Sequence, residues 1–298
     1  MPAHVDAVPE SLGRWPGSKR WLPALHAARL PHPRKRGRFF EPCVGAGAVS
    51  IHYARQGHRV VLGDANPRLV GVWRHLLSDP SALVAALAII AAEHDASSDK
   101  KAFYLAHRAR WNATDPASLE SAAGFLFTMN AGFNGVMRFN QRGRCNTPYG
   151  EPDYGKDLVR AGEIVALGSL LKRARAEAVL GDFEVTTAPA RRGDVVYFDP
   201  PFVRPAAKKG APRQKGTAGA GFVGYSPKGF TLADRKRLGQ LLRDLDQRGV
   251  LWVLSDVSAD HALAVYGLWS VTEVNVRRSV AAKGDARGRA CEVIVTNF

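Results

Sequence analysis

Residues 194–202 read Asp-Val-Val-Tyr-Phe-Asp-Pro-Pro-Phe, and the rest of the chain is interpreted outward from this stretch. The β-branched and aromatic run at 195–198 indicates a buried strand. It stops at Asp199, which is followed by two prolines and an aromatic residue. Because a residue before proline is kept out of the helical region, the backbone of Asp199 and Pro200 is expected to be extended. The stretch therefore predicts a rigid corner at a strand end, which presents the Asp199 carboxylate, the Pro200 carbonyl and the Phe202 ring.

Such a corner suits a planar base that carries an exocyclic amino group. The lone pair of that amine is delocalised into the ring, so the amine is a poor nucleophile. The Asp199 carboxylate and the Pro200 carbonyl are two acceptors for its two hydrogens, and neither Pro200 nor Pro201 has an N–H that would compete. Phe202 can stack on the base, as aromatic side chains do on extruded bases. Taken alone, the stretch is equally compatible with a proline-rich turn that carries one solvated aspartate.

The charge of the chain favours a polyanionic partner. Its 298 residues include 42 Lys and Arg against 27 Asp and Glu, which gives a net charge of +15 and a pI near 10.1. The basic residues recur along the whole chain, which favours nucleic acid over a membrane surface as the partner. The longest apolar run, at 82–92, is too short to span a bilayer. Residues 1–20 have no apolar signal-peptide core.

Length and cysteine usage set further limits. A chain of this length can bury a large core, as one domain with an insertion or as two domains. Cys43, Cys145 and Cys291 are odd in number, far apart and without metal-ligand spacing. We therefore expect a reducing, cytoplasmic setting and no metal.

The segment from 38 to 64 has the pattern of a nucleotide-binding βαβ unit. We expect in order a strand, a glycine turn, a helix and a second strand, at 38–41, 42–47, 48–56 and 59–62. The second strand leads to Asp64, 19 residues after Gly45, where an acid can bind ribose hydroxyls. Ser50 stands where the dinucleotide fingerprint has its third glycine, which argues against NAD.

The remaining patterns predict mostly helices and four further strands. Helices are expected at 67–77, 80–93, 99–111, 116–129 and 157–174, a strand at 178–180 and a loop at 181–183. A basic β-hairpin is expected around 141–143, and a mobile Gly/Ala-rich loop at 204–224. Thr231 and Asp234 form a capping box for a helix that ends at Arg248 and buries Leu238, Leu241, Leu242 and Leu245. Strands should follow at 250–254, 271–277 and 291–297, the last two antiparallel at one edge.

These stretches together resemble the Dam-type (D12 class) family of DNA adenine N6-methyltransferases, over nearly the whole chain and in the same order. Residues 14–19 look like the family's N-terminal cofactor motif, 40–49 like its glycine loop and 64–66 like its Asp-x-Asn element. Residues 133–150 look like its DNA-reading hairpin. Residues 199–202 match its catalytic motif, with Phe202 where tyrosine is usual. Pro16 and Ser18 depart from the commoner Ala and Gly.

The resemblance implies an α/β fold: a Rossmann-like methyltransferase domain with a mixed, mostly parallel sheet that carries an inserted helical and β-hairpin DNA-recognition domain. The catalytic domain would comprise 1–75 and 157–298, and the recognition domain 76–156. S-adenosylmethionine is the implied cofactor, with Trp15 and Lys19 at its methionine part and Asp64 at its ribose. Asp182 and Phe183 would meet its adenine. The glycine-loop residues implied to line the same site are Glu41, Pro42, Gly45 and Gly47.

The implied DNA contacts lie in the hairpin and in the Gly/Ala-rich loop. The hairpin residues are Phe133, Asn134, Arg138, Arg142 and Arg144, and the loop residues are Lys208 and Lys209. Arg138 holds the position from which the family reaches into the DNA groove. GATC is the recognition sequence to test first.

The leading hypothesis is therefore methyl transfer from S-adenosylmethionine to adenine N6 in duplex DNA after base flipping, with residues 199–202 (Asp199, Pro200, Pro201 and Phe202) as the catalytic set. Amino methylation of RNA, of cytosine N4 or of a protein glutamine is a second enzyme reading. A DNA-binding protein with an inactive cofactor pocket and a NAD-dependent oxidoreductase are further alternatives. The sequence leaves open the oligomeric state and the choice among a restriction–modification, a phage and a housekeeping role.

Overall fold

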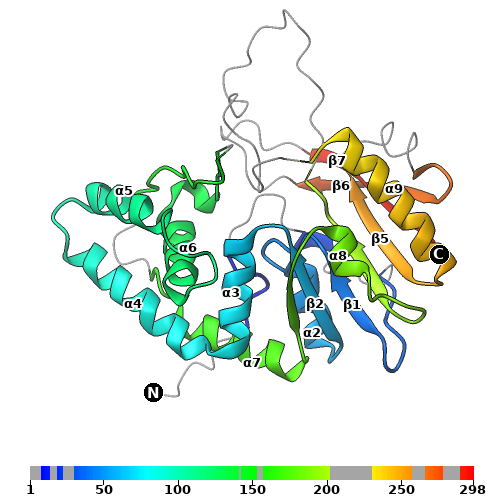
Figure 1. The fold of residues 1–298 in the computed structure, drawn as a ribbon, viewed down its shortest axis with the longest axis horizontal. Coiled ribbons are helices and arrows are strands. Elements are labelled where there is room, and N and C mark those ends of the chain that lie inside the picture. The colour runs from blue at the N-terminus through cyan, green and yellow to red at the C-terminus, as the bar shows by residue number, and fades with distance from the viewer. Residues whose placement is uncertain are drawn as a thin grey trace, which may run out of the picture.

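The computed structural model describes residues 8–13, 19–22, 30–140, 142–152, 157–201, 230–256, 266–277 and 289–298. A seven-stranded sheet in the order β3-β2-β1-β4-β5-β7-β6 runs through this part of the chain (Figure 1). Strands β1 to β5 are parallel, β7 runs antiparallel to β5, and β6 runs antiparallel to β7. The strands are β1 (Arg38–Glu41), β2 (Arg59–Asp64), β3 (Glu177–Leu180), β4 (Val195–Phe198), β5 (Leu251–Asp256), β6 (Ser270–Arg277) and β7 (Arg289–Thr296).

Strand β4 is buried on both faces, which explains its continuous apolar sequence. Val195 and Tyr197 join the hydrophobic cluster on one face of the sheet, and Val196 and Phe198 join the cluster on the other. The Tyr197 hydroxyl is satisfied by the Ser255 hydroxyl on β5, at 2.7 Å. The buried strand predicted at 195–198 is therefore confirmed, and its end is fixed in the middle of the sheet.

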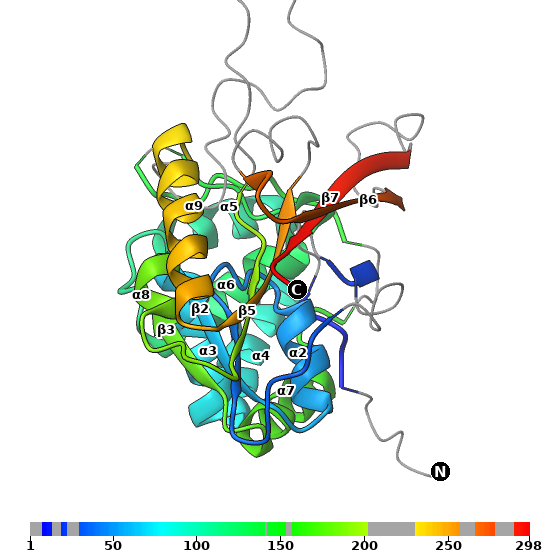
Figure 2. The same cartoon turned by 90° about the vertical axis from the view of Figure 1, so that its right-hand side faces the viewer.

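Helices cover both faces of the sheet (Figure 2). On one side lie α2 (Ala48–Arg55), α3 (Pro67–Ser78) and α7 (Ala161–Arg173), and on the other lie α8 (Phe183–Thr187) and α9 (Leu232–Gln247). Helix α9 begins with the predicted Thr231–Asp234 capping box. Of its four predicted core leucines, Leu238, Leu242 and Leu245 are buried, and Leu241 packs half-buried against them.

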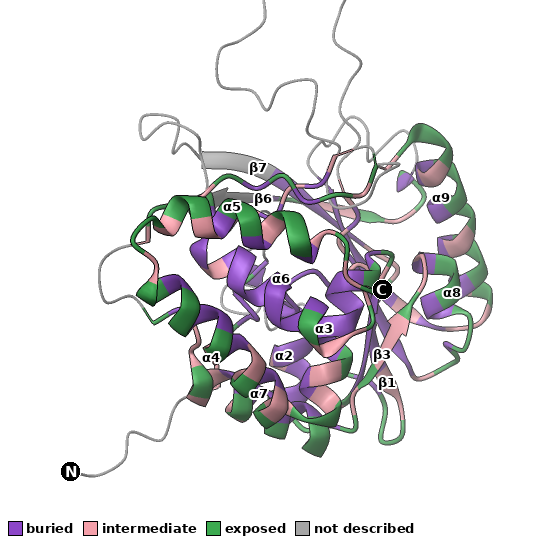
Figure 3. Ribbon diagram, turned by 60° about the vertical axis from the view of Figure 1, so that its left-hand side comes forward, coloured by how far each residue is buried: buried purple, intermediate pink, exposed green. Residues whose placement is uncertain are grey.

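A helical lobe extends from the first of these faces. It contains α4 (Pro80–Ala96), α5 (Lys100–Trp111), α6 (Leu119–Ala131) and the short 3-10 helix η2 (Phe133–Gly135). Helix α6 is buried along most of its length, between α3, α4 and α5 (Figure 3). The lobe and this face of the sheet share one hydrophobic cluster, so the lobe packs on the sheet through a common core.

The predicted elements are confirmed in kind and order within the described residues, except that the helix α8 begins inside the loop expected at 181–183. Three further elements differ in detail. Helix α7 begins at Ala161 and not at Asp157, because Asp157 accepts the backbone N–H groups of Val159 and Arg160 in a turn before the helix. Helix α6 begins at Leu119, after the Ser118 cap. The predicted hairpin has no regular strands: Phe139 and Cys145 form an isolated antiparallel bridge, and Gln141 lies outside the described residues. The loop expected at 204–224 also lies outside them.

No helix in the described ranges is long and apolar enough to cross a membrane.

Candidate active site

Carboxylates gather at the carboxyl ends of the parallel strands. Glu41 ends β1, Asp64 ends β2, Asp256 ends β5, and Asp199 directly follows β4. The strand order reverses at β1, between β2 and β4, and open α/β sheets bind ligands in the crevice at such a point. The sheet therefore brings the predicted catalytic aspartate and the predicted ribose-binding aspartate to the same edge.

Asp199 makes an ion pair that the sequence did not predict. The Lys19 ammonium lies 2.9 Å from Asp199 Oδ1 and 3.5 Å from Glu292 Oε2 on β7. The Lys19 side chain is 2% exposed, so the ammonium is almost wholly withdrawn from water. Burial alone lowers the pKa of Lys19, but Asp199 and Glu292 outweigh burial and raise it, so Lys19 stays charged. Burial raises the pKa of Asp199, and Lys19 opposes this increase.

The glycine loop has the backbone that its sequence predicts. Gly45 and Gly47 have φ values of 49° and 70°, in the left-handed region that favours glycine. A Cβ at Gly47 would lie 2.8 Å from the Trp73 ring, and the Trp73 indole N–H donates to the Gly45 carbonyl at 3.3 Å. Asp64 is tied to the same loop, because Oδ2 accepts the Gly45 N–H at 3.2 Å and Oδ1 accepts the Asn66 N–H at 2.9 Å. Burial raises the pKa of Asp64 to about 6.

Glu41 lies buried beneath this loop and meets the start of α2. Its Oε2 accepts the Ser50 backbone N–H at 2.8 Å and also the Ser50 hydroxyl. Burial raises the pKa of Glu41 to about 8. Pro42 is also buried and begins the turn. The serine that replaces the third fingerprint glycine is therefore the residue that holds Glu41 at the helix N-terminus.

Asp182 and Phe183 lie at the start of α8, on the side of the sheet that α9 covers. Asp182 caps α8 by accepting the N–H groups of Glu184 and Val185, and its other oxygen binds Arg237 of α9 at 2.6 Å. The Arg237 guanidinium lies 5.1 Å from the centre of the Phe183 ring, which is itself buried. Partial burial is the largest single influence on Asp182 and raises its pKa. The hydrogen bonds from Arg237, Val185 and Glu184, together with the Arg237 charge, outweigh it and lower the pKa, so Asp182 is ionised at neutral pH.

The predicted DNA-contacting residues of the hairpin follow α6. Phe133 is 54% exposed although it is a large apolar residue, and Asn134 has a φ of 55° in the left-handed region. Arg138 is half-buried, with its backbone N–H bound to the Thr147 hydroxyl at 2.9 Å. Arg142 and Arg144 are exposed. Aromatic and basic side chains of this kind are the residue types that nucleic-acid-binding surfaces combine.

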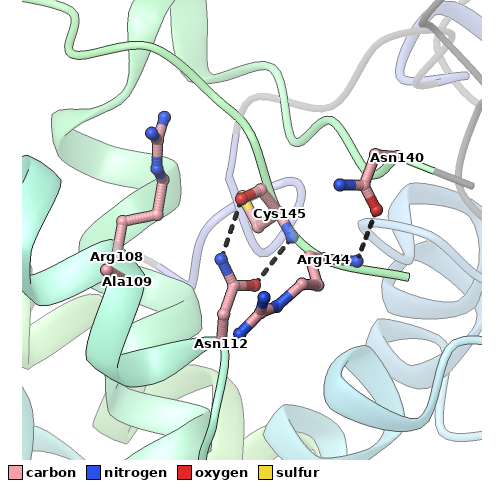
Figure 4. A pocket seen from close by; sticks show the side chains of 6 residues that line it. All are labelled: Arg108, Ala109, Asn112, Asn140, Arg144 and Cys145. Carbon is pink, nitrogen blue, oxygen red and sulfur yellow. Dashed lines mark hydrogen bonds between the residues drawn. The ribbon is translucent and has the colours of Figure 1, made fainter. Parts of the chain in front are cut away.

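A pocket of about 260 Å³ lies between α5 and the hairpin (Figure 4). Its lining residues are Arg108, Ala109, Asn112, Asn140, Arg144 and Cys145. The Asn112 amide clamps the backbone of Cys145, accepting its N–H at 2.7 Å and donating to its carbonyl at 2.9 Å. Asn140 accepts the N–H groups of Arg142 and Arg144, which fixes the turn that carries both arginines.

Trp15, Phe202, Lys208 and Lys209 lie outside the described residues, so their predicted roles have no structural counterpart here. The roles predicted for the other site residues remain predictions, now with positions. Three residues near the site were missed: Glu292, Arg108 and the Arg235 that pairs with Asp256 at 2.8 Å. The sequence offered a signal for Glu292 alone: it lies inside the apolar strand of residues 291–297, where burying a glutamate costs free energy unless it has a partner.

No group of three or more His, Cys, Asp or Glu residues within the described ranges is arranged to hold a metal ion.

The reversed last strand, the glycine loop at the switch point and the acid after β4 define a Rossmann-like methyltransferase. The chain matches the D12 class N6 adenine-specific DNA methyltransferase family over residues 15–280, and it belongs to this family. Methyltransferases of this kind act on DNA and in general take their methyl group from S-adenosylmethionine.

Similar proteins span nearly the full chain. A type II methyltransferase of Lactococcus lactis subsp. cremoris is 31% identical over 293 residues, covering 96% of this chain and 94% of the relative. A DNA adenine methylase of Vibrio cholerae serotype O1 is 28% identical, with 94% and 93% coverage. A type II methyltransferase of Methanocaldococcus jannaschii is 27% identical, with 96% and 98% coverage.

Proposed function

We propose that the protein transfers the methyl group of S-adenosylmethionine to N6 of an adenine that is flipped out of duplex DNA into the corner at the end of β4. The observation that carries this proposal is the position of Asp199, a carboxylate directly after a buried strand and at the same sheet edge as Asp64 and the glycine loop. The family match supports adenine as the target base, and the positions of Asp199, Asp64 and the glycine loop support the location of the active site.

Asp199 and the Pro200 carbonyl would accept the two N6 hydrogens and hold the amine with its lone pair out of conjugation. Because both acceptors follow a strand that is fixed in the middle of the sheet, they bind the amine without reorganising. Phe202 would stack on the flipped adenine. After methyl transfer, N6 carries a surplus proton, for which the Asp199 carboxylate is the nearest base.

The residues at the glycine loop fit S-adenosylmethionine, which supplies an electrophilic methyl group on a sulfonium sulfur when bound. The positive φ of Gly45 and Gly47 brings the backbone close to a ligand, and the Asp64 and Asp199 carboxylates near the loop suit a cation. Asp64 would hold the ribose hydroxyls and Lys19 would meet the methionine part. Asp182, with Phe183 beside it, would meet the adenine.

Recognition of DNA is assigned to the unit comprising residues 76–156, packed on a catalytic unit of 1–75 and 157–298. Arg138 would read a base edge, while Phe133 and Asn134 enter the duplex beside it. Arg108 and Arg144 line one pocket and would hold a phosphate there.

The same proposal places the protein in the cytoplasm. The names of two relatives support a role in restriction–modification, with GATC the first sequence to test.

The test is expression in a bacterial host that lacks DNA methylation, followed by long-read mapping of modified bases. We expect N6-methyladenine at one short sequence motif, and none in a culture that expresses Asp199→Ala at the same level. Methylation of cytosine N4, or of RNA alone, would overturn the substrate assignment. Binding of radiolabelled S-adenosylmethionine but not of NAD by the purified protein checks the cofactor separately.

A further inference from the structure

Lys19, Asp199 and Glu292 form a buried cluster of one cation and two carboxylates. The exposed fractions of the three side chains are 2%, 19% and 10% in that order, so the carboxylate of Asp199 is the one nearest solvent. Lys19 precedes the first strand of the sheet and Glu292 lies on the last. The cluster therefore depends on the folded sheet and is not a local feature of the catalytic motif.

This cluster poses a problem for the proposed role of Asp199. One of its oxygens is 2.9 Å from the Lys19 ammonium, whereas the target amine also needs a carboxylate acceptor. An ion pair of Lys19 and Asp199 alone has no net charge and would leave little negative charge for the target amine. Glu292, 3.5 Å from the same ammonium, gives Lys19 a second anionic partner and makes the cluster net negative when both carboxylates are ionised.

We propose that Glu292 is a positioning residue for methyl transfer: it holds the Lys19 ammonium, so that Asp199 keeps an acceptor oxygen and its negative charge for the target amine. The inference rests on the proposed function, because it assigns Asp199 to adenine N6. Glu292 itself does not touch the base and acts only through Lys19.

The charge that develops on N6 during the proposed reaction explains why a net negative cluster would help. The N6 lone pair forms a bond to the methyl carbon while the carbon–sulfur bond breaks and leaves its electron pair on sulfur. N6 thereby becomes cationic and loses one proton to the Asp199 carboxylate, from which the proton passes to solvent. A cluster that remains net negative favours the cationic nitrogen and accepts its proton, whereas a neutral pair does neither.

Other charged or titratable groups also face Asp199, from several elements of the sheet. They are Glu41 on β1, Tyr197 on β4, Asp256 on β5 with its partner Arg235 on α9, and Cys43 in the glycine loop. Glu292 and Asp256 both raise the pKa of Asp199 beyond the effect of burial, while Lys19 lowers it. Replacing Glu292 by a neutral residue should therefore lower the pKa of Asp199.

The test compares Glu292→Gln with wild type in kcat, measured from pH 5 to 9 at saturating S-adenosylmethionine and DNA. This range of about four pH units covers raised carboxyl pKa values, whereas ordinary ones, at about 4, lie below it. We expect kcat at pH 7.5 to fall roughly tenfold to a hundredfold, and the acid limb of the profile to move to lower pH. Glu273→Gln on the neighbouring strand β6 is the matched control, because Glu273 is exposed. Its profile should follow wild type.

A merely structural role would lower kcat at every pH by the same factor and leave the acid limb in place, and that result overturns the proposal. So does a wild-type profile for Glu292→Gln. Lys19→Met provides a double-mutant cycle: once Lys19 is absent, Glu292→Gln should change kcat less than twofold. If Glu292→Gln fails to fold, Glu292→Asp replaces it; this variant keeps the charge and should show a wild-type acid limb with a reduced kcat. A shifted limb in that variant counts against the proposal.

These outcomes are distinguishable from failure of the proposed function. If wild-type protein transfers no methyl group to adenine in DNA, the proposed function itself fails. If wild type is active and Glu292→Gln follows it at every pH, only the role of Glu292 is lost.

Discussion

Single residues divide the proposed chemistry between the target amine and the cofactor. Asp199 follows β4 and faces Lys19, whereas Asp64 accepts the N–H groups of Gly45 in the glycine loop and of Asn66. We expect Asp199→Ala to lose more than tenfold in kcat, about 1.4 kcal/mol or more of transition-state stabilisation, with little change in S-adenosylmethionine binding. Asp64→Ala should instead raise the KM for S-adenosylmethionine. Steady-state kinetics with titration calorimetry measure both, and an Asp199→Ala variant with near-normal turnover would refute the assignment.

Glu41 makes the stability of the cofactor-free protein depend on pH. Its pKa is about 8 in the folded state against an ordinary value of 4.5, so the folded protein holds a proton that the unfolded chain has lost. Between these two values the unfolding free energy should fall as pH rises, by at most about 1.4 kcal/mol per pH unit from this group.

Urea unfolding of the cofactor-free protein at pH 6 and 8 measures this fall. Glu41→Gln keeps an acceptor for Ser50 but does not titrate, so its unfolding free energy should fall less over this interval of about two pH units. Glu177→Gln is the control, because that glutamate is exposed at the far side of the sheet. Equal slopes for wild type and Glu41→Gln would show that Glu41 is already ionised.

The site residues that could be predicted from the sequence are those whose positions depend only on the neighbouring sequence. Asp199 and Asp64 each come directly after a strand, and a strand end is visible in the sequence as a change from apolar to polar and proline residues. Glu292 was not found, because its partner Lys19 is distant in sequence and only the strand order brings them together. Phe183 was predicted in a loop, but it begins a short helix and is buried under Arg237.

At the scale of elements, a buried arginine joins helix α3, which follows the Asp64 strand, to the hairpin. Arg68 on α3 follows the Asn66 cap, and its guanidinium donates to the hydroxyls of Thr114 and Ser121 and to the carbonyls of Asn112 and Thr114. Asn112 in turn clamps Cys145 in the hairpin. The hydrogen bonds therefore run without a break from α3 to the pocket of Figure 4.

Arg68→Met keeps an apolar stem but leaves these buried acceptors without a donor. We expect a loss of about 2–4 kcal/mol in unfolding free energy and a weaker affinity for DNA than for cofactor, because the hairpin is supported from this side. Arg74→Met on the exposed side of the same helix is the control and should change the unfolding free energy by less than about 0.5 kcal/mol. Urea unfolding and fluorescence anisotropy with labelled DNA provide the two readouts. An unchanged DNA affinity in a destabilised Arg68→Met would limit this residue to folding.

The hairpin and the Gly/Ala-rich loop should differ in what they read. An arginine can place two hydrogen bonds on guanine, worth about 1–3 kcal/mol of discrimination, whereas a lysine meets a phosphate as a point charge. Arg138→Ala should therefore relax sequence choice at one base pair. Replacing Lys208 and Lys209 by alanine should weaken all sequences alike. Methylation of single-base-changed oligonucleotides by both variants tests this, and a uniform loss for Arg138→Ala would exclude the hairpin as the reader.

Helices and parallel strands were predictable because their apolar periodicity is continuous, and α3, α4 and α5 begin and end within three residues of the expected positions. The hairpin was not, because side-chain hydrogen bonds replace much of its strand pairing. The Asn112 amide, which follows α5, binds the backbone of Cys145, and the Thr147 hydroxyl within the segment binds that of Arg138. Hydrogen bonds of this kind leave no periodic signal in the segment itself.

The whole molecule carries a net charge of +15, and its basic and acidic residues lie in different places. The excess of 42 basic over 27 acidic residues includes Arg108 and Arg144 at the pocket and Arg142 beside them. Exposed charge of this kind favours DNA by releasing counterions from the phosphates, so binding should weaken as salt is added. By contrast, four acids lie at the carboxyl ends of the strands, where the proposed cationic methyl donor would bind: Glu41, Asp64, Asp199 and Asp256.

The salt dependence of DNA binding measures how much of this charge reaches phosphates. If six or more Lys and Arg residues do so, affinity should fall roughly a thousandfold between about 50 and 200 mM salt, and each contact should contribute about 0.9 to the logarithmic slope. Replacing both Arg142 and Arg144 by alanine should therefore reduce the slope by about 1.8. The control replaces Lys172 and Arg173 of α7, the helix at the bottom of Figure 1, by alanine. This variant has the same net charge as the Arg142 and Arg144 variant, but its slope should equal that of wild type. If the two double variants reduce the slope equally, the +15 charge acts as a general field, and the hairpin is not a specific phosphate-binding surface.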